Sequence, residues 1–334
     1  MEKQLQGGLD RSGLCGGFRK DDREFRQILR ADPCDHLPPQ VHRRATRPGG
    51  ADRYGLGIEG ENAPSAEEDQ EAEELPAHGE EDHPDRRAGM KQYAYYPGCS
   101  LESLAKDYQL STLEVARTLG LEMKEIEDWN CCGATAYFPV DELLAYTLVA
   151  RNLAIAEKTG LTDFVAPCSA CFKNAYYTND YLKKDPDLAD HINFALEEDN
   201  LRVEGRMNVR HLIEVILEDV GLEEIRNRIA HPLKGLRVAP YYGCQILRPR
   251  KDHEEVENPR YFEELLSAIG AEPLEYASKT RCCGASLIIT NRKAALEMVR
   301  ILLKDAIDHG ADVIATTCPM CNINLEVYQG QVNR

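Results

Sequence analysis

The chain of 334 residues carries 40 Lys and Arg against 57 Asp and Glu, which gives a formal net charge of -17. Such an acidic balance argues against a nucleic-acid partner, because phosphate binding needs a basic face. No apolar run reaches 18 residues, so we expect no membrane span, and the first residues lack the basic-then-apolar pattern of a signal peptide. We therefore expect a cytoplasmic protein, in which clustered thiols are metal ligands rather than disulfides.

Residues 1–89 are predicted not to form a domain. They are rich in Gly, Pro, Arg and acids, and the stretch 61–85 contains eleven acids without one Lys or Arg. A segment of this kind cannot bury enough apolar surface to offset its chain entropy, which predicts disorder. Two interpretations stay open: an acidic interaction tail, or a mistranslated extension of a protein that starts at Met90. Cys15 and Cys34 lie here and belong to no motif.

From residue 90 the chain contains an internal repeat, in which predicted strands alternate with helices. In each copy a strand leads to a single cysteine, a helix and a second strand lead to Cys-Cys-Gly-Ala, and a long helix and a third strand lead to Cys-x-x-Cys. The predicted helices and third strands cover 113–119, 141–159 and 162–166 in the first copy, and 261–269, 292–309 and 312–316 in the second. This alternation predicts two tandem α/β units with largely parallel sheets, related by pseudo-two-fold symmetry.

The predicted domains are 90–231 and 232–334. After its last cysteine the first copy continues with a predicted strand and helix at 208–220, whereas only thirteen residues follow Cys321 in the second copy. The second domain is therefore predicted to be truncated at its C-terminal end.

Ten of the twelve cysteines occupy equivalent positions in the two copies. The first set is Cys99, Cys131, Cys132, Cys168 and Cys171, and the second set is Cys244, Cys282, Cys283, Cys318 and Cys321. Two matches in register argue strongly against chance packing of buried cysteines. The sequence therefore predicts two metal centres with five thiolates each.

Iron–sulfur clusters suit these thiolates better than zinc. Structural zinc takes four ligands, usually from two Cys-x-x-Cys pairs, whereas each copy has five cysteines and one such pair. Adjacent cysteines suit a cluster, because their sulfurs reach different iron atoms, although the spacing of cubane ferredoxins is absent. Each Cys-x-x-Cys is predicted to begin a helix, whose N-terminus favours thiolate. Gly133 and Gly284 are predicted to let the backbone approach inorganic sulfide. Zinc, and a dithiol–disulfide enzyme, stay as alternatives.

In these motifs the sequence resembles the cysteine-rich CCG-domain family, and within it the B subunits of heterodisulfide reductases. The resemblance covers residues 90–334 and rests on YYPGC (95–99), WNCCG (129–133), PCSAC (167–171), RCCGA (281–285) and CPMCNINL (318–325). It implies two noncubane 4Fe–4S clusters, each held by the five cysteines of one copy. It also implies one-electron cleavage of a disulfide, with one sulfur captured at each cluster. The implied partners are a C subunit with cubane iron–sulfur clusters and a flavin-bearing A subunit.

Several other side chains near the cysteines have ordinary structural roles as their default interpretation. An anionic substrate would need cations, and the candidates are Lys173, Arg248 and Arg281, each of which we expect to be a solvated surface charge. His211 and His231 are expected to be structural. Core packing is the expected role of the tyrosines before each first cysteine, which are Tyr95, Tyr96, Tyr241 and Tyr242.

The sequence therefore favours the catalytic iron–sulfur subunit of a heterodisulfide reductase-like complex, which reduces a disulfide or a related sulfur substrate to thiols. A second hypothesis is an electron-relay or quinone-reducing CCG module of a glycolate or lactate oxidase or a succinate dehydrogenase-like complex. A third is a non-catalytic metal-binding scaffold subunit.

Overall fold

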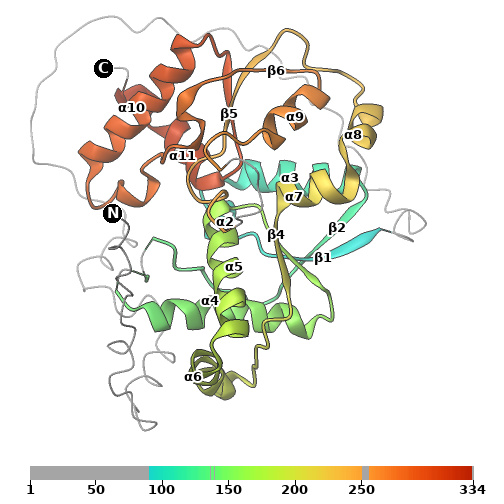
Figure 1. The fold of residues 1–334 in the computed structure, drawn as a ribbon, viewed down its shortest axis with the longest axis vertical. Helices are drawn as coiled ribbons and strands as arrows, with labels where there is room; N and C mark the ends of the chain where they lie inside the picture. Colours follow the sequence, from blue (N-terminus) through green and yellow to red (C-terminus); the bar gives the residue numbers. More distant parts are fainter. Residues whose placement is uncertain (1–89, 136, 139, 250–255, 333–334) are drawn as a thin grey trace, which may run out of the picture. The chain divides into compact units, whose positions relative to one another are not determined.

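The structure is a computed structural model that describes residues 90–249, apart from 136 and 139, and residues 256–332 (Figure 1). The predicted disordered or mistranslated extension at 1–89, with Cys15 and Cys34, lies outside the described residues. All described residues belong to one compact unit that covers residues 88–334.

The first copy of the repeat forms a four-stranded parallel sheet in the order β2-β1-β3-β4. Parallel strands need crossover connections, and helices supply them here. The strands are β1 (Lys91–Tyr95), β2 (Leu121–Glu125), β3 (Asp163–Ala166) and β4 (Asn208–His211). The helices are α2 (Cys99–Glu102), α3 (Lys106–Thr118), α4 (Glu142–Lys158), α5 (Ser169–Lys184), α6 (Pro186–Leu196), the 3-10 turn η3 (Glu197–Asp199), α7 (Leu212–Val215), the π-helical turn η4 (Ile216–Val220) and α8 (Leu222–Arg228).

The second copy forms a three-stranded parallel sheet in the order β6-β5-β7, which repeats the order β2-β1-β3. Its strands are β5 (Arg237–Tyr241), β6 (Glu272–Pro273) and β7 (Val313–Thr316). Its helices are α9 (Tyr261–Ala268), the 3-10 turns η5 (Ala277–Thr280) and η6 (Ala285–Leu287), α10 (Arg292–Asp308), α11 (Pro319–Val327) and α12 (Gln329–Val332).

The third strands of the two sheets differ in their surroundings. β3 lies between β1 and β4 and all four of its residues are buried. β7 pairs only with β5 among the described residues, and Val313 on it is 44% exposed. A pocket of about 490 Å³ lies beside β7, between α10 and α11, and its apolar lining includes Ile307 and Leu325. The edge of the second sheet at β7 is therefore open within the described residues.

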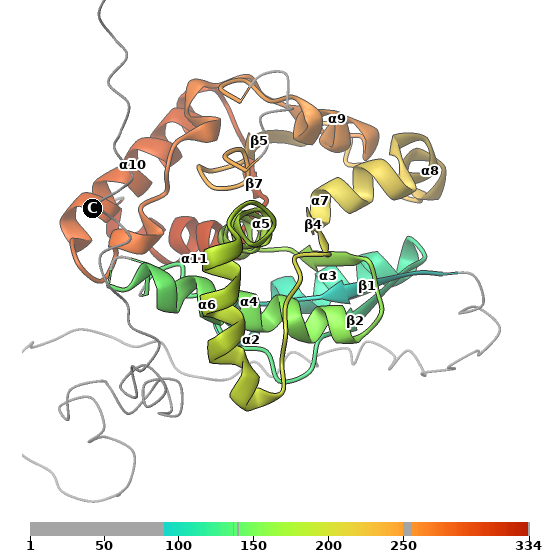
Figure 2. The same ribbon diagram turned by 60° about the horizontal axis from the view of Figure 1, so that its bottom comes forward.

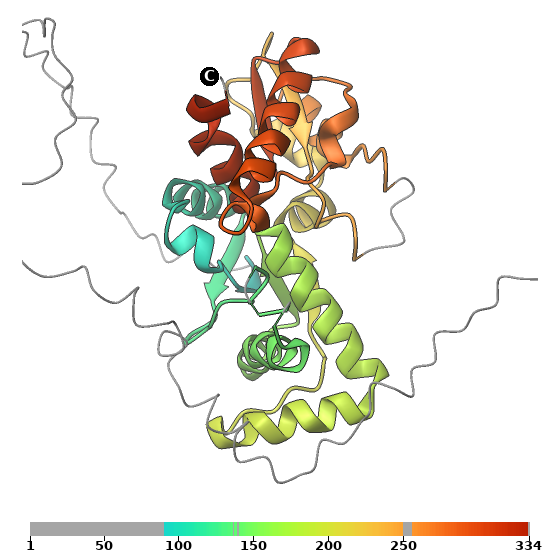
Figure 3. The same cartoon turned by 90° about the vertical axis from the view of Figure 1, so that its left-hand side faces the viewer.

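The two copies contact each other reciprocally, as the predicted pseudo-two-fold symmetry requires. Tyr177 on α5 of the first copy donates its hydroxyl hydrogen bond to the carbonyl of Arg248, just after the single cysteine of the second copy, at 2.9 Å. In the equivalent contact α11 of the second copy packs against α2, which begins at the single cysteine of the first copy. Figure 2 shows α5 at the junction of the two copies, and Figure 3 shows the second copy, coloured orange to red, above the green helices of the first copy. The fold class is thus confirmed.

One core of buried apolar side chains runs through both copies. It contains residues from both sheets, such as Phe164 and Val238, together with six of the cysteines. These cysteines are Cys132, Cys168, Cys171, Cys283, Cys318 and Cys321. These six thiols therefore lie inside the packed interior of the unit rather than on a surface loop.

Candidate metal centre

The cysteines of each copy follow the carboxyl ends of three strands, which meet at one edge of a parallel sheet. In the first copy Cys99 follows β1 and Cys168 follows β3. Cys99 Sγ lies 3.5 Å from Cys131 Sγ, and Cys132 Sγ lies 3.4 Å from Cys171 Sγ. The fold thus places side by side cysteines that are far apart in the sequence.

The second copy repeats these contacts. Cys283 Sγ lies 3.4 Å from Cys321 Sγ, as Cys132 does from Cys171. Cys282 shares a hydrogen bond with Cys244, as Cys131 does with Cys99. The five-cysteine pattern found in the sequence is therefore also a repeated arrangement in space.

The two sets of thiols meet at Cys168 and Cys318, whose Sγ atoms are 3.9 Å apart. On either side of this contact, the equivalent cysteines of the two copies follow in the same order. The ten thiols therefore form one array, which we call the thiol array. Its centre is buried, whereas its ends are open: Cys99 is exposed and Cys244 is partly exposed. A small molecule could thus approach the array from two equivalent ends.

Hydrogen bonds favour the thiolate form at equivalent positions of the array. Hydrogen bonds from Cys132 and Cys99 lower the pKa of Cys131 to about 3, and the backbone N–H of Gly133 adds to this lowering. A hydrogen bond from Cys244 and the N–H of Gly284 lower the pKa of Cys282 to about 6, against the effect of burial. Thiolate is the form that binds metal.

Each Cys-x-x-Cys pair begins a helix, as predicted. Cys168 and Cys318 are the N-cap residues of α5 and α11. The pKa values of these two thiols shift in opposite directions, because the thiols share a hydrogen bond. Hydrogen bonds from Cys168 and Cys321 lower the pKa of Cys318, whereas the pKa of Cys168 is raised: its hydrogen bond with Cys171 opposes the raising effects of Cys318 and of burial.

Two glycines leave room beside the thiols, but they are not the two that the sequence predicted. A Cβ atom on Gly98 would lie 2.8 Å from Cys171 Sγ, and one on Gly243 would lie 3.2 Å from Cys321 Sγ. At Gly133 and Gly284 a Cβ atom would instead meet the side chain of Tyr137 at 2.9 Å and the backbone of α10 at 3.1 Å. Protein packing and a positive φ are therefore sufficient to explain the last two, and their predicted approach to inorganic sulfide stays a prediction.

The donor set fits a cluster that takes thiolate ligands from several directions. Each set supplies five sulfurs and no other ligand type, and the glycines keep space beside two of them. Within the described residues, no group of three or more His, Cys, Asp or Glu has the geometry of a single-ion site. Soft thiolate ligands of this kind suit iron–sulfur clusters.

Two equivalent tyrosines fix the loops that carry the cysteines. The hydroxyl of Tyr96 donates to the carbonyl of Asn130 at 2.8 Å, and that of Tyr241 donates to the carbonyl of Arg281 at 2.6 Å. Each acceptor directly precedes a double cysteine. Tyr96 and Tyr241 are fully buried, so their expected packing role is accompanied by a specific tie between two cysteine loops. Tyr95 and Tyr242 are also buried, but their hydroxyls bond to Gln109 and Glu263 instead.

Two equivalent asparagines, which sequence reasoning missed, hold the double cysteines against the helices. Asn174 Nδ2 donates to the carbonyl of Cys132 at 3.2 Å, and Asn324 Nδ2 donates to the carbonyl of Cys283 at 2.6 Å. Both side chains are 2% exposed. The signal was present in the sequence, because each copy reads Cys-x-x-Cys-x-x-Asn.

Replacement of Asn174 or Asn324 by alanine should destabilise the protein by about 1–3 kcal/mol, because each leaves a buried carbonyl without its donor. We expect iron to be lost to a chelator faster from the matching set of cysteines only. Thermal unfolding and the kinetics of iron release measure the two effects. Asn179→Ala is the matched control, since Asn179 on the same helix makes the same bond to the carbonyl of Met207, away from the thiols. Equal iron loss in all three variants would contradict a local role.

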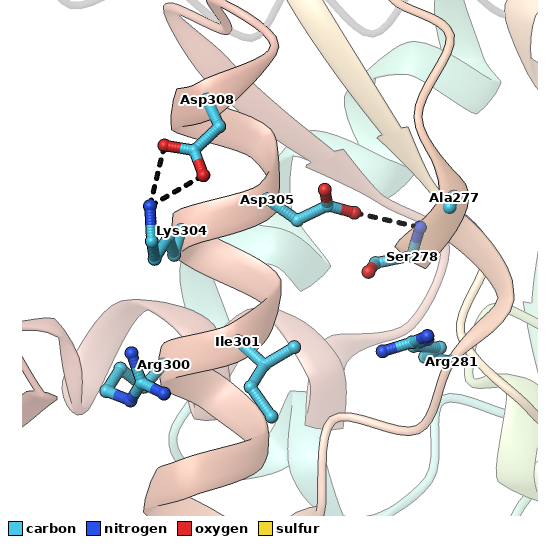
Figure 4. Close-up of a pocket in the computed structure, with 8 residues that line it drawn as sticks. All are labelled: Ala277, Ser278, Arg281, Arg300, Ile301, Lys304, Asp305 and Asp308. Carbon is cyan, nitrogen blue, oxygen red and sulfur yellow. Dashed lines mark hydrogen bonds and ion pairs between the residues drawn. The ribbon is translucent and has the colours of Figure 1, made fainter.

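The three candidate cations have different positions. Lys173 on α5 is half-buried and interacts electrostatically with Cys244 and Arg248 of the other copy. The side chain of Arg281 points instead into a pocket of about 260 Å³ against Ile301 of α10, where Lys304 is paired with Asp308 (Figure 4). Lys173 and Arg248 therefore lie near the thiol array. Arg281 instead interacts there through its backbone carbonyl, which accepts the hydrogen bond of Tyr241.

The two histidines and one missed tyrosine complete the surroundings. His231 is exposed, whereas His211 is buried and caps α7 through a hydrogen bond from the N–H of Ile213. Burial lowers the pKa of His211, which favours its neutral form and fits the structural role expected of it. Tyr108 on α3 was not singled out in the sequence; it is half-buried, and burial first and then the charges of Cys318 and Cys168 raise its pKa.

Comparison with known proteins gives consistent matches. The family model described as "Cysteine-rich domain" (CCG) matches residues 93–174 and 238–326. The membrane anchor of the 8-methylmenaquinol:fumarate reductase of Wolinella succinogenes is 34% identical over 242 residues, which are 72% of this chain and 84% of that protein. The B subunit of the ferredoxin/F(420)H(2)-dependent CoB-CoM heterodisulfide reductase of Methanosarcina acetivorans is 30% identical over 249 residues, 73% of this chain and 82% of that protein.

Two further matches cover the same region. A protein of Archaeoglobus profundus, named for its likeness to the B subunits of heterodisulfide reductases, is 30% identical over 254 residues, 73% of this chain and 84% of that protein. A solved structure of a hypothetical protein from Helicobacter pylori shares the fold with a TM-score of 0.58 and 14% identity, over 73% of this chain and 44% of that one.

In the part of the chain that the structure describes, no helix has the length and apolar character needed to cross a membrane.

Proposed function

Because the chain belongs to the cysteine-rich CCG domain family, as its cysteine motifs predict, we propose that residues 90–334 form the catalytic iron–sulfur subunit of a heterodisulfide reductase-like complex. The two sets of five cysteines each hold one noncubane 4Fe–4S cluster, in domains 90–231 and 232–334. The single observation that carries this proposal is the repeated arrangement of the ten thiols in one array.

The arrangement suits reduction of a disulfide or a related sulfur substrate. Iron–sulfur clusters, when bound, exchange one electron at a time, whereas cleavage of a disulfide consumes two electrons. The two cysteine sets adjoin at Cys168 and Cys318, so a substrate at this junction is within reach of both. Burial of the central thiols excludes water, and Tyr96, Tyr241 and the paired asparagines hold the cysteine loops in position.

The relatives are parts of redox complexes by name, so partner subunits belong to the proposal. We propose a C subunit with cubane iron–sulfur clusters and a flavin-bearing A subunit as electron donors, in the cytoplasm. The Wolinella relative supports a second candidate, because its name makes it a membrane anchor of a menaquinol:fumarate reductase. In that case the chain relays electrons to or from a quinol-linked partner.

Anaerobically purified protein should contain about eight irons and eight inorganic sulfides per chain, since two four-iron clusters are proposed. Metal and sulfide analysis measure this directly. Tightly bound zinc without iron would overturn the cluster proposal. Reduction of a small disulfide to two thiols by the chemically reduced protein then tests the function, and a protein that oxidises a quinol but leaves disulfides intact would favour the relay.

A further inference from the structure

The two open ends of the thiol array differ in charge, although the array itself is symmetric. Near Cys244 the side chains of Lys173 and Arg248 are cationic. The equivalent residues of the other pair of segments are Ile323, two residues after Cys321, and Ser103, four residues after Cys99. They lie on α11 and at the end of α2, two helices that contact each other. The exposed acid Glu102 adds a negative charge on α2, next to Cys99 in the helix. Duplication of the cysteines has therefore not duplicated their charged surroundings.

The cationic end is built by contacts between the copies. Arg248 Nε donates to the carbonyl of Cys244 at 3.2 Å, and the carbonyl of Arg248 accepts the hydroxyl of Tyr177 at 2.9 Å. Lys173 precedes Tyr177 by four residues on α5, so both lie on one face of this helix, the face toward Cys244. The electrostatic interactions of Lys173 with Cys244, Arg248 and Cys132 agree with this position. Two positive charges are thus held close together at the Cys244 end of the thiol array.

Lys173, which is half-buried, and Arg248, which is exposed, have no carboxylate partner among the described residues, unlike the buried cations Arg210 and Lys279. Arg210 is paired with Asp219 at 2.6 Å, and Lys279 is paired with Glu263 at 2.6 Å. Lys173 is half-buried, so its charge is less well solvated than that of a free surface lysine. An oxyanion placed between Lys173 and Arg248 would compensate both charges through charge-assisted hydrogen bonds.

We propose that Lys173 and Arg248 form a subsite for one oxyanion of the sulfur substrate, such as a carboxylate, at the Cys244 end only. The inference rests on the proposed function and names its substrate class: an unsymmetrical sulfur compound whose anionic arm points to the second cysteine set. Its other arm, next to Ile323 and Ser103, is neutral or apolar. Lys173 and Arg248 are specificity residues and take no part in electron transfer.

Binding can be measured apart from turnover with thioethers, which the protein cannot reduce. Cluster-loaded protein is titrated calorimetrically with thiodiglycolate, which is anionic, and with thiodiglycol, its neutral counterpart. Lys173→Met and Arg248→Met should each weaken thiodiglycolate binding about tenfold and leave thiodiglycol unchanged, as expected for loss of a hydrogen bond to a charged group. Lys183→Met, an exposed lysine near the other end of α5, is the matched control and should leave both affinities unchanged.

Asymmetry is tested with three disulfides that carry two carboxylates, one carboxylate or none. The compound with one carboxylate should bind as tightly as that with two, and about tenfold more tightly than the neutral one. A fourth disulfide, cystamine, is cationic. Lys173→Glu should reverse the preference for anionic disulfides, so that this variant binds cystamine more tightly. Equal affinities for all three disulfides, or equal effects of all lysine variants, would overturn the subsite while disulfide reduction still supports the proposed function.

A variant that shifts the reduction potential without changing the choice of ligand would also overturn the subsite, since the cations would then only balance thiolate charge. Conversely, thioether binding with the expected charge preference, but without reduction of any disulfide, would leave the subsite standing and contradict the proposed function. The failures of the two proposals are thus distinguishable.

Discussion

Cys132→Ala should remove the cluster of the first cysteine set and retain most of the second, and Cys283→Ala should do the opposite. Each residue is buried and contacts the second cysteine of the Cys-x-x-Cys pair in its own copy, at 3.4 Å from Cys171 or Cys321. Iron content should fall by about half in each variant, because four-iron clusters are lost as units. Thiolate–metal bonds also stabilise the surrounding fold, so each half should loosen separately. Iron analysis and spectra of both variants measure this.

The same variants test the division of labour in turnover. If cleavage of a disulfide needs both clusters, either substitution abolishes disulfide reduction, although the remaining cluster still accepts an electron. Because the two sets touch at Cys168 and Cys318, a shared centre is the relevant competing model. Equal loss of all iron in both variants would favour that shared centre. Full activity of either variant would favour a simple electron relay.

Lys279→Met should lower the free energy of unfolding by about 3–5 kcal/mol, because it leaves a buried carboxylate without its partner. The Lys279 and Glu263 side chains are 3% and 7% exposed, and Nζ also donates to the carbonyl of Pro259. The backbone carbonyl of Lys279 accepts the N–H groups of Tyr242 and Gly243, directly before Cys244. We therefore expect the second cluster to be lost before the first when the variant is heated. Iron spectra measure the loss of each cluster, and denaturant unfolding measures the change in stability.

Two further variants separate this effect from a loss of surface charge. Arg237→Met breaks an ion pair with Asp312 in the same copy, but the two side chains are 50% and 39% exposed, so little loss of stability is expected. Lys279→Met combined with Glu263→Leu should recover part of the stability, because no buried charge is left unpaired. A single Lys279→Met variant as stable as Arg237→Met would refute the structural role of this pair.

The fold was largely predictable because its local signals agree with its repeat. The helix predicted at 141–159 is α4, whose start is fixed by a hydrogen bond from the Leu144 N–H to the Asp141 carboxylate and whose end is followed by Gly160 with a positive φ. The helix predicted at 113–119 is shorter than α3, which begins at Lys106 without a side-chain cap. A helix start without a capping residue leaves little trace in the sequence.

The cysteines of the candidate site could be identified from the sequence, but their supporting residues could not. Asn174 and Tyr96 act through backbone carbonyls of segments more than thirty residues away, and such bonds depend on the packing of helices against strands. The charge difference between the two ends was missed for a related reason. Lys173 belongs to the first copy by sequence, yet it faces the second, so only the contact between copies reveals its place.

Strand β7 has further importance for the behaviour of the purified protein. An unpaired strand edge is a template for β-pairing between molecules, and proteins usually protect it with charge, proline or a covering element. At β7 the described residues offer little such protection, since Val313 is 44% exposed and the neighbouring Ile307 is 65% exposed. Self-association at high concentration should therefore start at this edge, and Val313→Lys should suppress it without affecting the iron content. The protection of this strand edge, rather than cluster assembly, would then set the highest concentration at which the protein stays monomeric.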